Sequence, residues 1–252
     1  MGILNRLLNK NDPGSKAYRL HAAANRLSDS GKVREAEIQY GEAMKLYREA
    51  ESAGCSDAKL LTGYAILLMR EGDFAKAKEI VASIFKDKSL NEDDRYHLRI
   101  NHAVCQWHLG HLDKALEDMN KASEYAKIGL FYNVMGALKV QEGREKGDFA
   151  EAEAFMAEAL DYDEDDLAAQ DNLGWLRYYT GDRTAARKAF KKAVAKNSHY
   201  SPALAGLALI EHEDGDDAAA KEHLKTALSV HFPTMSPITR QWAEDLQSRL
   251  GD

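Results

Sequence analysis

Apolar side chains recur every three or four residues along most of the chain, which predicts amphipathic helices rather than strands. The run that contains Leu61, Ala65 and Leu68 is one example. Each run ends at a glycine suited to the left-handed conformation that follows a helix, and a second run begins just after it. An aspartate often opens the second run, where its carboxylate can cap free backbone N–H groups. The pattern therefore predicts helical hairpins.

The hairpins recur at a regular interval. Gly147, Gly181 and Gly215 are each 34 residues apart, and the same frame returns with looser spacing upstream at Gly31, Gly72 and Gly110. Small residues recur at one position of five first helices and at one position of all six second helices, where they let helix axes approach closely. They are Ala65, Ala103, Gly136, Gly174 and Ala208 in first helices, and Ala36, Ala77, Ala115, Ala152, Ala186 and Ala220 in second helices. We expect leucine at Gly174 or Ala186 to overpack this crossing by about 1 to 3 kcal/mol.

This pattern resembles the tetratricopeptide repeat (TPR) family over roughly residues 17 to 230. The resemblance implies an all-α, right-handed α-solenoid of about six helical hairpins. The expected array covers residues 15–232, with units near 17–54, 58–88, 94–127, 129–162, 167–198 and 201–231. The fourth unit contains two candidate turn glycines, Gly143 and Gly147. Either a first helix longer by about one turn or a longer loop would accommodate them.

Both ends carry segments outside the array. Residues 1–14 form an N-terminal extension in which Met1 to Leu8 could cap the first unit, fray, or touch a membrane or partner. At the other end, residues 233–252 predict a C-terminal capping helix, since Ser236 is suited to the N-cap and Pro237 to the first helical position. Its apolar face is predicted to contain Ile238, Trp242, Leu246 and Leu250.

The family resemblance implies that the first helix of each unit lines a concave groove. We predict that a partner binds there, because amides pair with peptide groups and aromatic side chains are frequent binding anchors. The predicted partner-binding residues are Met69, Arg70, Asn101, Trp107, Asn133, Asn172, Trp175, Tyr178 and Tyr179. Packing of Trp107, Trp175 and Tyr178 against the next repeat remains an alternative, as does self-association.

Charge and composition narrow the class of partner. The formal net charge is −7, so the chain would on average repel a phosphate backbone, and we expect no nucleic acid. The longest apolar stretch, residues 60–69, is about half of a membrane span. The two cysteines form no CxxC pair, which indicates a reduced, cytoplasmic protein. The acidic stretch 141–172 is expected to face the basic stretch 183–196 or to recruit a basic partner.

Candidate chemistry is sparse. The string His102, Cys105, His108 and His111 suggests a metal site, but successive steps of three residues turn its members away from one another on one helix. No nucleophile, phosphate-loop or dinucleotide motif is present. We therefore expect no catalytic residue, no metal and no cofactor. The sequence predicts a non-enzymatic cytoplasmic scaffold that binds a peptide segment or protein; the alternative is a self-assembling structural homo-oligomer.

Overall fold

The computed structural model describes residues 12–251, and within that range the chain forms 13 α-helices and no β-strand. The all-α class is therefore confirmed. The expectations for Met1 to Leu8 lie outside the described residues. The chain divides into two compact units, residues 1–111 and 112–252, which we call the N-terminal and C-terminal units.

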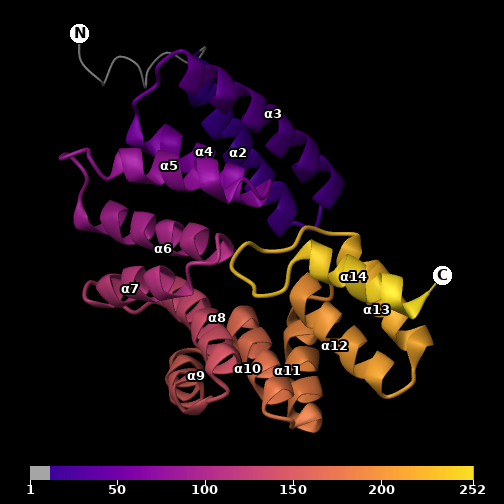
Figure 1. The fold of residues 1–252 in the computed structure, drawn as a ribbon. Helices are drawn as coiled ribbons and strands as arrows, with labels where there is room; N and C mark the ends of the chain where they lie inside the picture. The colour runs from indigo at the N-terminus through magenta and orange to yellow at the C-terminus, as the bar shows by residue number, and fades with distance from the viewer. Residues whose placement is uncertain (1–11, 252) are drawn as a thin grey trace. The chain divides into compact units, whose positions relative to one another are not determined.

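In the N-terminal unit, consecutive helices pack against one another as antiparallel hairpins, and each hairpin packs against the next (Figure 1). Its helices are α2 (Pro13–Asp29), α3 (Val33–Ser52), α4 (Ala58–Arg70), α5 (Phe74–Ile84) and α6 (Glu92–His108). The first helices of successive hairpins also touch, because α2 contacts α4 and α4 contacts α6. This second set of contacts extends a row of hairpins into a stack.

The C-terminal unit repeats this arrangement. Its helices are α7 (Leu112–Ser123), α8 (Gly129–Lys146), α9 (Ala150–Tyr162), α10 (Leu167–Tyr179), α11 (Arg183–Lys196), α12 (Ser201–Glu213), α13 (Asp217–Leu228) and α14 (Arg240–Leu250). Helix α10 lies beside both α8 and α12, and α12 also contacts α14. Every residue of α12 from Ser201 to Glu211 is buried, as expected for a helix enclosed on all sides.

The predicted turn residues adopt the predicted conformations. All six turn glycines have positive φ, for example 88° at Gly181 and 84° at Gly215. The aspartates that follow cap the second helices: Asp182 accepts a hydrogen bond from Ala185 N at 2.9 Å, and Asp216 accepts one from Ala219 N at 3.1 Å. The glycine thus ends the first helix of each hairpin, and the aspartate begins the second.

The small-residue positions are buried where helices cross. Ala65, Ala103 and Ala186 each have no exposed surface. At the crossing of α10, α11 and α12, the ring of Phe190 lies between Gly174 and Gly206, and a Cβ atom added to either glycine would come within 2.5 Å of that ring. This contact explains why glycine is needed at both positions.

The structure resolves the ambiguity in the fourth hairpin. Helix α8 continues through Gly143 to Lys146, and Gly147 adopts the left-handed conformation that ends it. The extra residues therefore lengthen the first helix rather than the loop. Gly143 is buried in this added turn, where a Cβ would lie 2.7 Å from Phe149 Cδ1, and its carbonyl accepts a hydrogen bond from Asp148 N at 3.1 Å.

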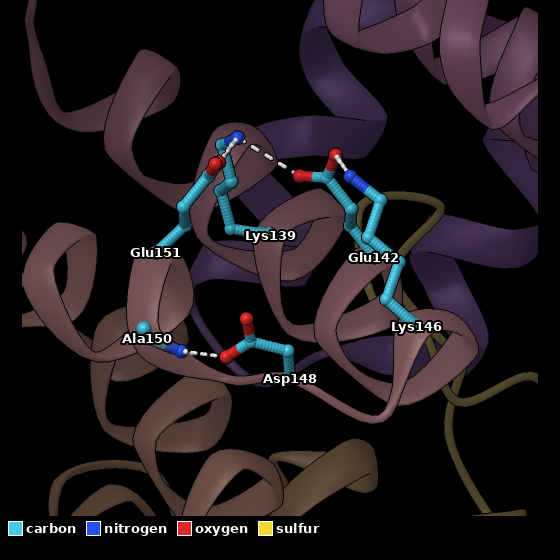
Figure 2. A network of polar contacts seen from close by, with 6 residues as sticks. All are labelled: Lys139, Glu142, Lys146, Asp148, Ala150 and Glu151. Carbon is cyan, nitrogen blue, oxygen red and sulfur yellow. Dashed lines mark hydrogen bonds and ion pairs between the residues drawn. The ribbon is translucent and has the colours of Figure 1, made fainter.

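A charge network joins the lengthened helix to α9 (Figure 2). Lys139 Nζ lies 2.8 Å from Glu142 Oε2 and 2.5 Å from Glu151 Oε2, and Lys146 Nζ lies 2.6 Å from Glu142 Oε1. Burial opposes the charge on Lys139, but the two carboxylates outweigh it and raise the pKa of that amine. Burial likewise opposes the charge on Glu142, and the two lysines outweigh it and lower the pKa of the carboxyl.

We expect Glu142→Gln to lower the free energy of unfolding by about 1 kcal/mol, because it leaves the part-buried Lys139 with one carboxylate instead of two. Glu142 contributes its stability above the ordinary carboxyl pKa and loses it as pH falls through the lowered pKa, so the deficit should shrink in acid. Urea unfolding at neutral and acidic pH measures both effects. Glu124→Gln, at an exposed position of the same unit, is the control; equal stability of the two variants would contradict the prediction.

Both ends of the described chain differ from the expected boundaries. Helix α2 begins at Pro13, with Asp12 as its N-cap, so Pro13 and Gly14 belong to the helix and not to the extension. Helix α14 begins at Arg240, not at Pro237, because Thr239 caps it by accepting a hydrogen bond from Trp242 N at 3.2 Å. Ser236 instead accepts a hydrogen bond from Ile238 N in a local turn.

Candidate functional site

The predicted groove residues of the N-terminal unit are mostly buried. Met69, Asn101 and Trp107 are no more than 7% exposed. Arg70 is half-buried, its guanidinium lies over the ring of Tyr40 at 4.1 Å, and it forms an ion pair with Glu37. These side chains therefore take part in packing within the unit, and Arg70 is the one of the four with a partly accessible charge.

His21 is a buried residue of the N-terminal unit. It is 7% exposed, and its Nδ1 is 3.5 Å from the hydroxyl of Tyr47. Burial, reinforced by the positive charge of Arg70, lowers the pKa of His21 to about 4. The imidazole is therefore neutral in the folded protein at neutral pH.

We expect His21 to make the protein acid-sensitive. Because its folded pKa is lowered, its contribution to stability is present above pH 6.5 and is lost as pH falls toward 4. The loss should reach about 3 kcal/mol. Urea unfolding of His21→Gln at pH 7 and pH 4.5 should show a weaker pH dependence than the parent protein. His199→Gln, at an exposed position, should keep the parent dependence; identical slopes in all three proteins would refute the assignment.

In the C-terminal unit, the predicted asparagines connect first helices to one another. Asn172 is 3% exposed, and its Nδ2 donates a hydrogen bond to the backbone carbonyl of Asn133 at 3.0 Å. Gly136 makes room for this contact, because a Cβ there would lie 2.9 Å from Asn172 Nδ2. Asn172 thus joins α10 to α8, while Asn133 is half-buried.

Trp175 belongs to the core rather than to the surface. It is 1% exposed, and its ring centroid lies 5.2 Å from that of Phe190 and 5.5 Å from that of Trp242 in α14. The packing alternative therefore describes the position of Trp175. The prediction that Trp175 is an exposed aromatic anchor was therefore wrong.

Tyr178 and Tyr179 are half-buried near the end of α10, and the rings of both contact the ring of Trp175. The Tyr178 hydroxyl donates a hydrogen bond to Glu213 Oε1 at 2.6 Å. The guanidinium of the exposed Arg144 lies 5.3 Å from the ring centroid of Tyr179. We call Arg144, Tyr178, Tyr179 and the half-buried Trp242 the tyrosine patch.

An acidic residue that sequence reasoning overlooked lies beside this patch. Asp171 is 1% exposed, and a side-chain hydrogen bond from the Trp175 indole partly offsets the cost of burying its carboxyl group. Burial raises the pKa of Asp171 well above the ordinary carboxyl value. Asp171 precedes Trp175 by one helical turn, and this spacing was the signal available in the sequence.

Two members of the suggested metal-binding string, Cys105 and His108, pack against other side chains instead. The rings of His108 and Phe74 stack at 4.0 Å. Cys105 is fully buried, and burial raises the pKa of its thiol to about 12. Over residues 12–251 no group of three His, Cys, Asp or Glu side chains is placed to hold a metal ion.

An ion pair at Asp165 joins the acidic stretch 141–172 to the basic stretch 183–196. Lys192 Nζ lies 3.0 Å from Asp165 Oδ1. The other end of the basic helix α11 pairs with the following hairpin instead, since Arg183 lies 2.8 Å from Glu213. None of the described helices combines the length and the apolar character that a membrane crossing requires.

Comparison with known proteins agrees with this architecture. Residues 172–233 match a tetratricopeptide repeat family model. A tetratricopeptide repeat protein from Parabacteroides merdae has 19% identity and a TM-score of 0.54, over 93% of this chain and 85% of its own. A thermophilic TPR protein of Thermus thermophilus has 17% identity and a TM-score of 0.59, over 77% of this chain and 97% of its own.

A third similar structure is the Cut9–Hcn1 hetero-tetramer of the APC/C, with 17% identity and a TM-score of 0.58. That match covers 99% of this chain and 45% of the other. No curated protein sequence matches this chain. The family match over residues 172–233 agrees with the resemblance, and the similar structures show that this chain shares the fold of tetratricopeptide repeat proteins.

Proposed function

We propose that this chain is a non-enzymatic scaffold that binds a peptide segment or a protein surface. The observation that supports the proposal is the tyrosine patch, where two half-buried tyrosines and an exposed arginine lie together near the end of α10. Tyr, Trp and Arg are the residues most enriched at binding hot spots. Tyr and Trp in particular bury a large area at a low cost in side-chain entropy.

The proposed site is narrower than the predicted groove. Five of the predicted groove residues are buried and pack between helices: Met69, Asn101, Trp107, Asn172 and Trp175. Tyr178 and Tyr179 retain accessible surface in the C-terminal unit, as Arg70 does in the N-terminal unit. Binding would be non-covalent and without a cofactor. The chain has only two cysteines, neither of them in a CxxC motif, and this low cysteine content supports a cytoplasmic setting.

Affinity capture from a lysate of the source organism tests this function. We expect the double variant Tyr178→Ala/Tyr179→Ala to lose at least about tenfold of the captured partner, since each hot-spot residue contributes about 2 kcal/mol. Thermal unfolding by circular dichroism verifies that the variant remains folded.

The matched control is Tyr125→Ala/Tyr162→Ala, which removes two tyrosines of the same unit that are 51% and 52% exposed. Capture that survives in the Tyr178/Tyr179 variant, or is lost equally in the control, would refute the proposed site. Light scattering over a concentration series tests self-assembly, which predicts a mass above that of one chain at micromolar concentration.

A further inference from the structure

Positive charge is concentrated on α2 and α4, the first helices of two successive hairpins in the N-terminal unit. The chain as a whole has a formal net charge of −7. These two helices contain a single acidic residue, Asp29, against five basic ones, which are Lys16, Arg19, Arg26, Lys59 and Arg70. Because α2 and α4 also contact each other, an acidic protein carries a locally basic surface here.

A cation and an aromatic ring connect the beginnings of the two helices. Lys59 Nζ in α4 lies 4.9 Å from the ring centroid of Tyr18 in α2. Tyr18 is 37% exposed, and Lys59 is exposed as well. Because Lys59 is exposed, an anion of a binding partner can reach its ammonium group. Among residues 12–251 no carboxylate pairs with Lys59.

A second cation lies at the other end of α4. The guanidinium of Arg70 lies over the ring of Tyr40 at 4.1 Å, and the Tyr40 hydroxyl donates a hydrogen bond to Asn25 Oδ1 at 2.8 Å. Arg70 also pairs with Glu37, whose side chain is 49% exposed. An ion pair with so exposed a carboxylate contributes little to stability, so a carboxylate of a partner can join or replace Glu37.

An exposed apolar side chain lies between the two cations. Ile66 follows Lys59 by seven residues and precedes Arg70 by four, which places all three within an arc of about 40° on one face of α4. Ile66 is 40% exposed. The Cα atoms of Lys59 and Arg70 are about 16 Å apart along the helix. We call Tyr18, Lys59, Ile66 and Arg70 the basic face.

We propose that the basic face binds an acidic peptide segment of a protein partner. An extended peptide rises about 3.3 Å per residue, so two carboxylates about five residues apart meet Lys59 and Arg70. An apolar side chain between these carboxylates contacts Ile66 and Tyr18. This apolar contact favours a peptide over a nucleic acid, whose backbone places further phosphate charge there. The inference goes beyond the proposed function, because the basic face belongs to the N-terminal unit and the tyrosine patch to the C-terminal unit.

The test is an NMR titration of the full chain, followed through the isoleucine methyl resonances. The probe is a hexapeptide with both termini blocked, glutamate at both ends, leucine at the third position and serine elsewhere. We expect a saturable shift at Ile66 and none at Ile128, which is 41% exposed in the C-terminal unit. The same peptide with glutamine at both ends should bind at least about tenfold more weakly. Equal binding of the two peptides, or no saturable shift at Ile66, overturns the inference.

Variants make the test specific. Lys59→Gln should weaken binding of the glutamate peptide at least about threefold, and Lys59→Gln/Arg70→Gln at least about tenfold, because each substitution removes a charge that meets a carboxylate. Lys45→Gln, at an exposed position of α3, should leave binding unchanged. Lys59→Gln alters only an exposed side chain, so it keeps the test valid if circular dichroism shows that the double variant is unfolded.

Two further results would overturn the inference. One is unchanged binding of the glutamate peptide by Lys59→Gln, and the other is tighter binding of a thymidine hexanucleotide than of that peptide at Ile66. The proposed scaffold function is judged separately, by the loss of lysate capture in the Tyr178/Tyr179 variant.

Discussion

Substitution of Gly174 by leucine should lower the free energy of unfolding by about 3 kcal/mol or more. A Cβ at this position would lie 2.5 Å from Phe190 Cδ1 and 2.8 Å from Cζ, well inside van der Waals contact. The ring cannot move toward α12, because a Cβ at Gly206 would already lie 2.5 Å from Phe190 Cζ. Overpacking of a core usually costs about 1 to 3 kcal/mol, and a ring held on both sides places this case at the upper end.

The matched control for this substitution is an exposed helical glycine. Gly41 has no heavy atom within 4 Å of the position its Cβ would take. Gly41→Ala should stabilise the protein by about 0.5 to 1 kcal/mol through helix propensity alone, whereas Gly174→Ala should destabilise it. Urea unfolding measures both changes. If the two alanine variants shifted stability in the same direction, the close approach of α10, α11 and α12 would be wrong.

Substitution of Trp175 by alanine should cost about 3 to 5 kcal/mol, because it removes a fully buried indole and leaves a cavity. The Trp175 ring contacts the rings of both Phe190 and Trp242. Trp242→Ala should cost less, since that ring is half-buried. The double variant should show coupling of about 1 kcal/mol between the two rings.

The expected loss of stability separates two roles for Trp175. Thermal and urea unfolding of Trp175→Ala should show a large destabilisation, and any loss of partner capture would then follow from the loss of structure. A variant that unfolds like the parent protein but no longer captures its partner would make Trp175 a surface anchor instead, contrary to its burial.

The sequence was sufficient to predict the hairpins because local chemistry specifies them. Glycine at a positive φ and aspartate at the N-cap act within a few residues, and the small residues at helix crossings recur with the same period. The helix ends Thr239 and Pro13 were harder to place, because Ser236 and Gly14 offered competing signals of similar strength. The division of the chain after His111 left no local signal that we recognised.

The site was less predictable because it depends on contacts between distant segments. Helical spacing turned Trp175 away from the packed face beside Gly174, which suggested exposure. Its cover comes from Trp242, in a helix much later in the chain, and Asn172 is buried because it donates to the backbone of α8. Neither contact could be inferred from the periodicity of α10 alone.

Photo-crosslinking can show whether the partner binds at the tyrosine patch. A photoreactive phenylalanine derivative would replace Tyr179 in the tyrosine patch, and in a second variant Tyr162, which is exposed elsewhere in the same unit. We expect the captured partner to be crosslinked from position 179 and not from position 162. Crosslinking from position 162 alone would show that the partner binds a different surface.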